Sequence, residues 1–149
     1  MKRRKVTGGR NGRERLSGVP RVTVVQDREG DIYESYPLLK EHGVNWVIRA
    51  SHDRKAKWEG GSGRASEYLA GKEAAGSYGI EAARRGEKKR SVKREVRFGK
   101  ITVEQPAGRA KEERQKYPGE IEMYVVQAKE EKGAGAADGK KEINWTLYT

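Results

Sequence analysis

Cysteine is absent from the 149-residue sequence, and histidine is present only as His42 and His52. The lack of thiols excludes a disulfide framework, a cysteine nucleophile and any zinc or iron–sulfur site that depends on cysteine ligands. Two imidazoles are too few for a multi-histidine metal centre, and neither stands in a pattern typical of Ser-His-Asp catalysis. The chain therefore lacks the side chains of several common enzyme classes.

Apolar residues are also scarce. They make up 34% of the chain, against about 45–50% in typical globular domains. This composition indicates an incomplete core, as in a fragment or a partly disordered chain, and the length allows at most two small domains. No apolar run approaches the ~18–20 residues that span a bilayer, and none follows the basic N-terminus as in a secretory signal. We therefore expect a cytoplasmic protein that has no membrane partner.

Basic residues, by contrast, are in excess, and the net charge is +11. Residues 1–15 hold seven lysines and arginines with one acid, and residues 84–100 hold nine with two acids, so these segments carry the whole excess. Clustered positive charge is typical of a polyanion partner, because binding to phosphates releases condensed counterions. The alternatives are a solvated tail and hairpin or, less favoured without an apolar face, an anionic membrane surface.

The front half of the chain follows an α/β pattern. A valine-rich run at 22–25 predicts a buried strand, the spacing of apolar residues predicts a helix over 32–41, and residues 46–48 predict a second buried strand. Two strands joined by a helix within about 30 residues favour a parallel βαβ unit. The polar residues 51–63 predict a loop.

The back half changes to a period of two, which is typical of antiparallel strands with one polar face. A short helix is expected from Ser66 to Ala75. The expected strands span residues 78–82, 92–98, 100–104, 121–128 and 143–148. We therefore predict an α/β front half and a β-rich back half, with residues 1–19 forming a basic, partly disordered segment.

Two residues are candidates for chemistry on position alone. Asp27 directly follows the valine run, and ligand sites in open α/β sheets form at the carboxyl ends of strands, so it could hold a divalent cation. A turn residue is the alternative interpretation, with Asp31 as a helix N-cap. Trp145 lies in an alternating strand and is either a core residue or a platform for an unpaired base. Trp58, in the polar loop, is a candidate surface or interface aromatic.

A specific resemblance covers residues 22–55. The strand there ends in Asp27-Arg-Glu-Gly-Asp-Ile32, and the next strand is followed by Arg49, His52 and Arg54 in an Arg-x-x-His-x-Arg pattern. This stretch resembles the middle of bacterial DDE transposases of the hairpin-forming, cut-and-paste insertion-sequence class. Ordered but individually weak likenesses continue to residue 149, and Phe98-Gly-Lys-Ile-Thr-Val is one of them.

The resemblance implies a partial RNase H-like core over residues 20–63 and a β-strand insertion region over residues 64–149. Members of this family hold two Mg²⁺ or Mn²⁺ ions with three acidic residues, cleave transposon ends and transfer strands within a dimeric synaptic complex. Asp27 matches the second of these acids and would be both catalytic and metal-binding. The other two have no counterpart here, so we expect an internal fragment that is inactive alone, from a bacterial, nucleoid-associated protein.

DNA contacts also carry over from the family. The residues implied to contact transposon ends are Arg49, Arg54, Lys55, Tyr78 and Trp145. Tyr78 would bind the phosphate of a flipped base, and Trp145 would stack on that base. Two other hypotheses remain: a small basic nucleic-acid-binding or regulatory protein without catalysis, and a translated remnant without function.

Overall fold

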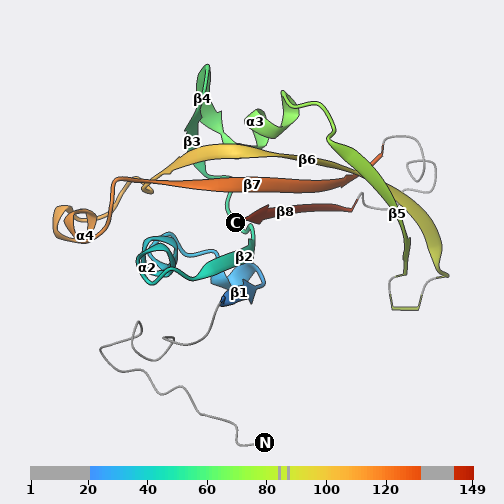
Figure 1. Ribbon diagram of the computed structural model, residues 1–149, viewed down its shortest axis with the longest axis horizontal. Helices are drawn as coiled ribbons and strands as arrows, with labels where there is room; N and C mark the ends of the chain where they lie inside the picture. Colours follow the sequence, from blue (N-terminus) through green and yellow to red (C-terminus); the bar gives the residue numbers. More distant parts are fainter. Residues whose placement is uncertain (1–20, 84, 87, 132–142) are drawn as a thin grey trace, which may run out of the picture.

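The computed structural model describes residues 21–83, 85–86, 88–131 and 143–149. The segment 1–19, for which partial disorder was expected, lies outside these residues, as do positions 84 and 87 of the second basic cluster. Along the described chain the elements are β1 (Thr23–Gln26), the 3-10 helix η1 (Arg28–Gly30), α2 (Ser35–Glu41), β2 (Asn45–Arg49), β3 (Lys55–Trp58), β4 (Gly61–Arg64), α3 (Ala65–Ala70), β5 (Gly76–Ala82), β6 (Arg90–Glu104), α4 (Lys111–Lys116), β7 (Glu120–Glu130) and β8 (Asn144–Tyr148) (Figure 1).

The expected strand–helix–strand unit is present at the front of the chain. β1 and β2 pair in parallel, with Thr23 opposite Asn45 and Gln26 opposite Ile48. The helix between them starts at Ser35 rather than at residue 32, because the preceding residues form η1 and a turn. Tyr36 of this helix is fully buried. The βαβ prediction is therefore confirmed, with a shorter helix. The expected burial of the first strand was wrong, because β1 lies at the edge of the described sheet and Val25 is 74% exposed.

One mixed sheet joins the front and back of the chain. Its strand order is β1-β2-β8-β7-β6-β3-β4. β5 pairs with the N-terminal part of β6, from Arg90 to Val96. The last strand, β8, is the link, because it pairs antiparallel with both β2 and β7. The fold is thus mixed α/β and rich in strands, and the sheet runs across the boundary expected at residue 63.

Three local expectations for the middle of the chain were wrong. Residues 51–63 are not a loop throughout, because β3 and β4 form a hairpin that turns at Gly60, whose φ is +88°. The two strands expected at 92–98 and 100–104 are one strand, which passes through Gly99 without a break. The helix expected from Ser66 to Ala75 is the shorter α3, and the Ser66 hydroxyl donates to Asp53 instead of capping the helix.

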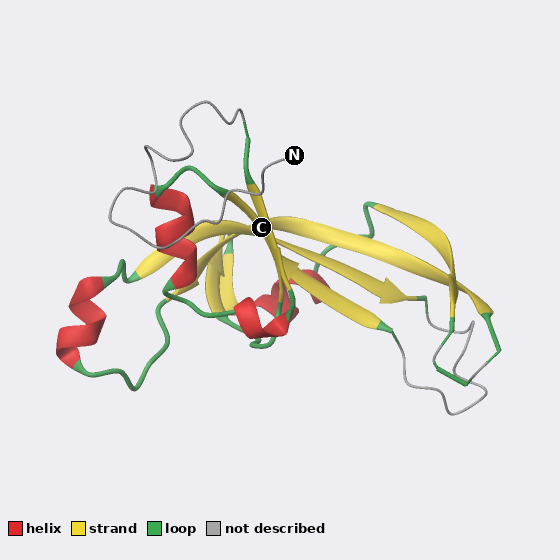
Figure 2. Cartoon of the chain, turned by 90° about the horizontal axis from the view of Figure 1, so that it is seen from below, coloured by secondary structure: helices red, strands yellow, loops and turns green. Residues whose placement is uncertain are grey.

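The two faces of the sheet differ in burial. The helices α2 and α3 pack with the inner face into one apolar cluster, which includes Tyr36, Leu69, Ile101, Val125 and Tyr148. The large exposed apolar side chains of the described strands are Val25, Tyr78, Phe98, Tyr124 and Trp145. Val92 and Arg94, at the end of β6 that pairs with β5, are buried although they share the outer face with Phe98. Figure 2 shows how the helices gather around one end of the long strands. Function is therefore to be sought on the side that the helices leave open.

Candidate nucleic-acid interface

Asp27 and Arg49 meet where the parallel strands β1 and β2 end. Asp27 is the N-cap of η1, and its carboxylate accepts a hydrogen bond from the Arg28 amide at 2.8 Å. The Arg49 Nη1 atom lies 3.5 Å from the same carboxylate oxygen. The Asp27 side chain is 73% exposed, so this ion pair is screened by water and contributes little to stability.

The surroundings of Asp27 do not by themselves form a metal centre. Its carboxylate is exposed to solvent, accepts a hydrogen bond from the Arg28 amide and forms an ion pair with Arg49. Within the described residues, no three histidine, cysteine, aspartate or glutamate side chains come together as metal ligands. A Mg²⁺ ion takes six ligands in an octahedron, of which one or two are usually protein carboxylates and several are waters or substrate oxygens. Asp27 therefore offers one ligand, and the remaining ligands would have to come from elsewhere.

Trp145 lies on β8 beside the same strand ends, and 42% of it is exposed. The guanidinium carbon of Arg49 is 4.4 Å from the centre of the indole ring, and that of Arg94 is 5.7 Å from it. Both distances are within the range of cation–π attraction. The buried residue of β8 is Tyr148, so Trp145 is a surface residue next to Arg49 rather than part of the core.

Tyr78 extends this surface from the neighbouring hairpin. It is 41% exposed and lies directly opposite Arg94 in the pairing of β5 with β6. Arg94 itself is 8% exposed, and its Nε atom has no hydrogen-bond partner in the described structure. The structure thus brings Arg49, Trp145, Arg94 and Tyr78 into one row across the sheet. We call these four residues the Trp145 surface.

Arg94 is the member of this surface that sequence reasoning missed. In the sequence it is one of several basic residues in the 84–100 segment, and nothing there distinguishes it from Lys93 or Arg97. Because side chains alternate along a strand, Arg94 points to one face of the sheet, and its neighbours Lys93 and Glu95 point to the other. A strand prediction with the correct register would have been the only available signal.

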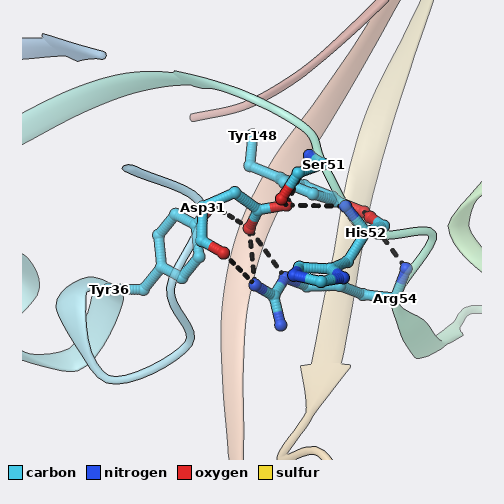
Figure 3. A network of polar contacts seen from close by, with 6 residues as sticks. All are labelled: Asp31, Tyr36, Ser51, His52, Arg54 and Tyr148. Atoms are coloured by element: carbon cyan, nitrogen blue, oxygen red, sulfur yellow. Dashed lines mark hydrogen bonds and ion pairs between the residues drawn. The ribbon is translucent and has the colours of Figure 1, made fainter. Parts of the chain in front are cut away.

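Arg54, for which the resemblance implies a DNA contact, does not belong to this surface. It is only 6% exposed, and its guanidinium is bound to Asp31 (Figure 3). The Nε atom donates to Asp31 Oδ1 at 3.0 Å, and Nη2 donates to the same oxygen at 2.5 Å. A third hydrogen bond runs from Nη2 to the Asp31 carbonyl at 3.0 Å. A guanidinium held in this way inside the fold is not available to a phosphate.

The carboxylate of Asp31 is the centre of this buried network. Its Oδ2 atom accepts from the backbone amides of Ser51 at 2.8 Å and His52 at 3.0 Å, and Oδ1 also accepts from the Tyr36 hydroxyl at 2.7 Å. Burial alone would raise the pKa of Asp31, but hydrogen bonds from Arg54, Tyr36 and His52 outweigh it and hold the pKa below its usual value. The network fixes the segment that follows Arg49 against the loop that follows Asp27.

Two tyrosines close the network on the inner side. Burial raises the pKa of Tyr148 to about 12, and its hydroxyl donates to the His52 carbonyl at 2.8 Å. Burial and the nearby Asp31 carboxylate likewise raise the pKa of Tyr36. Both hydroxyls therefore stay protonated at neutral pH and act as donors. Their role is to position the strand ends rather than to transfer protons.

Lys55 lies apart from the Trp145 surface. It starts β3, and the strands β8, β7 and β6 separate β3 from β2 in the sheet. Its ammonium is exposed and lies 3.5 Å from Glu104. The structure therefore groups Arg49, Tyr78 and Trp145 of the predicted DNA contacts, and it separates Lys55 and Arg54 from them.

A polar cavity of about 230 Å³ opens beside Arg49, between the end of β2 and the strand β8. Its lining includes Arg28, Ser51, Gln127, Asn144 and Thr146. Arginine, hydroxyl and amide side chains are the usual donors to phosphate oxygens. Asn144, Thr146 and Tyr148 alternate with Trp145 along β8, so the cavity opens on the opposite face of this strand, and its lining also includes the carboxylate of Asp53. It therefore does not extend the Trp145 surface.

Comparison with known proteins found no family model that matches this chain and no curated protein that is significantly similar to it. The resemblance to DDE transposases therefore stays a prediction. The described helices are all too short or too polar to cross a membrane.

Proposed function

We propose that this chain binds DNA and that the Trp145 surface receives an unpaired base. The observation that carries the proposal is the exposed indole of Trp145 with two arginine guanidinium groups within 6 Å of its centre, at 4.4 and 5.7 Å. Aromatic rings next to cations are the usual platform for unpaired bases, because the ring stacks on the base and a cation binds the flanking phosphate. Arg49 is the cation open to a phosphate, because Arg94 is only 8% exposed. The net charge of +11 supports a polyanionic partner.

Stacking on one tryptophan offsets part of the free-energy cost of taking a base out of a duplex. Stacking of a base on an aromatic side chain contributes about 1–3 kcal/mol, and taking a base out of a duplex costs a few kcal/mol. Arg49 lies over the indole and is also close to Asp27. A phosphate that takes over its guanidinium would free the ring for the base, so that stacking and phosphate binding support each other.

We further propose that the chain is part of a DDE transposase-like protein with an RNase H-like core. The Asp27-Arg-Glu-Gly-Asp-Ile32 motif and the parallel pairing of β1 with β2 support this proposal. On this proposal Asp27 is a ligand for Mg²⁺ or Mn²⁺ once two further carboxylates are supplied. The isolated chain is then expected to leave DNA uncut in the presence of either ion, and specific cleavage that Asp27→Ala abolishes would contradict this.

The binding proposal is tested with two duplexes that differ by one unpaired base. Trp145→Ala should weaken binding to the duplex with the unpaired base by about fivefold or more, which corresponds to ~1–3 kcal/mol of stacking. Binding to the fully paired duplex should change less. Tyr124→Ala is the matched control, because this ring is equally exposed on the adjacent strand at 48%. Equal affinity of wild type and Trp145→Ala for the first duplex would refute the proposal.

A regulatory DNA-binding protein without catalysis is the second candidate. The observation that favours it is the ion pair of Asp27 with Arg49, which holds the one candidate catalytic carboxylate against a cation. An experiment that adds a transposase-like partner chain, which provides the missing carboxylates, distinguishes the two candidates by DNA cleavage. Restored cleavage that depends on Asp27 supports the first, and inhibition of the partner's cleavage supports the second.

A further inference from the structure

A second aromatic and basic site lies at the edge of β6 that faces away from β7, across the two long strands from β8 and Trp145. A groove of about 700 Å³ opens between the β3–β4 hairpin, α3 and the middle of β6. Its aromatic lining consists of Trp58, Tyr68 and Phe98. The rings of Trp58 and Tyr68 lie 5.2 Å apart at a tilted angle, and Phe98 is 50% exposed. The functional site described above uses none of these residues.

The groove borders an open stretch of sheet edge. β5 pairs with β6 only as far as Val96, and β3 pairs with it only at Thr102 and Val103. Between these limits the outer edge of β6 has no partner strand in the described structure. Because the Val96 carbonyl accepts from Ala75 on this edge, the backbone groups of Phe98 and Lys100 also point to it by strand alternation. The groove thus offers donors and acceptors in addition to rings.

The charge of the groove favours an anionic ligand. Three lysines and two glutamates line it, namely Lys57, Lys72, Lys100, Glu59 and Glu122. Lys57 and Lys100 each have a glutamate within 3.2 Å or less at the surface. The ammonium of Lys72 instead lies 5.2 Å from the centre of the Tyr68 ring, and it makes no ion pair in the described part of the chain. Lys72 is therefore the cation best placed to bind a phosphate.

From this combination we propose that the groove binds single-stranded nucleic acid around the open edge of β6, with one base against Phe98, another against the Trp58–Tyr68 pair and a backbone phosphate on Lys72. The inference rests on the proposed DNA-binding function and adds a second contact for an unpaired strand. Sequence-tolerant sites for single strands combine aromatic platforms with lysines in this way. A polypeptide strand that pairs with the open edge of β6 is the competing occupant.

The test measures binding of the full chain to a labelled oligothymidylate of about 8 nucleotides, a length typical of such sites. Phe98→Ala should weaken binding by about fivefold or more, the loss expected for one stacked base. Lys72→Met should lower the slope of log affinity against log salt by about 0.7, the value for one phosphate contact in a single strand. Both residues are exposed, so both variants should fold, and thermal unfolding checks this.

Tyr124→Ala is the control, since Tyr124 is as exposed as Phe98 but lies outside the groove. If Phe98→Ala binds oligothymidylate as tightly as wild type and Tyr124→Ala do, the inference is wrong. This outcome is the one expected if the groove binds a polypeptide strand instead. The duplex with one unpaired base separates the two proposals. If Trp145→Ala weakens binding to that duplex but Phe98→Ala leaves binding to oligothymidylate unchanged, only this inference is overturned. If wild type binds neither probe, both proposals fail.

Discussion

Two aspartate–arginine pairs lie close together in this protein and behave in opposite ways. Asp27 and Asp31 belong to the same short motif, and of their partners Arg49 ends β2 and Arg54 follows it five residues later. The Asp31–Arg54 pair is buried, with side chains 0% and 6% exposed and atoms 2.5 Å apart. The Asp27–Arg49 pair is open, with side chains 73% and 26% exposed and atoms 3.5 Å apart. One pair thus holds the strand ends in place, and the other leaves its charges accessible at the surface.

The largest expected effect comes from breaking the buried pair. Arg54→Met should lower the free energy of unfolding by about 3–5 kcal/mol, because it leaves the Asp31 carboxylate buried without its cation. Denaturant unfolding followed by circular dichroism measures this loss. Arg49→Ala is the matched control and should change stability by less than about 1 kcal/mol, as for other exposed pairs. Similar losses in the two variants would contradict the contrast between the pairs.

An acid titration sharpens the same comparison. The folded structure lowers the pKa of Asp31 below its ordinary value of 3.8, so its ionised form stabilises the fold fully at higher pH. This contribution should be lost as the pH falls through 3.8 toward the lower pKa of the folded state. Asp31→Asn should be less stable at neutral pH and should lose less stability on acidification. An acid-induced loss of stability in Asp31→Asn as large as that of wild type would contradict the assignment.

The smallest effect on stability, and a clear effect on binding, is expected for the open pair. Arg49→Ala should weaken DNA binding and lower the salt slope on duplex DNA by about 0.9, the value for one lost phosphate contact. Its stability should stay close to that of wild type, because the side chain is partly exposed and its ion pair is screened. Anisotropy titrations at several salt concentrations measure the slope. An unchanged slope would remove Arg49 from the interface.

Much of the local structure followed from the sequence. The valine run before Asp27, the apolar spacing of the following helix and the strand at Trp46 predicted the parallel βαβ unit correctly, because β-branched runs and helical spacing are local signals. The β-rich character of the back half was also correct. The β3–β4 hairpin was missed because its strands are only four residues each and consist largely of glycine and polar residues.

The tertiary structure alone decided which charges are buried and which strands meet. Arg49 and Arg54 differ little in the sequence. Arg49 nevertheless lies at the surface, and Arg54 is buried against Tyr36 and Tyr148, because only the fold determines what surrounds a side chain. Trp145 shows the same limit. Its alternating strand favoured burial, but the register of β8 between β2 and β7 buries Tyr148 and leaves the indole open beside Arg49. Strand register depends on partners far along the chain, so no local pattern contains it.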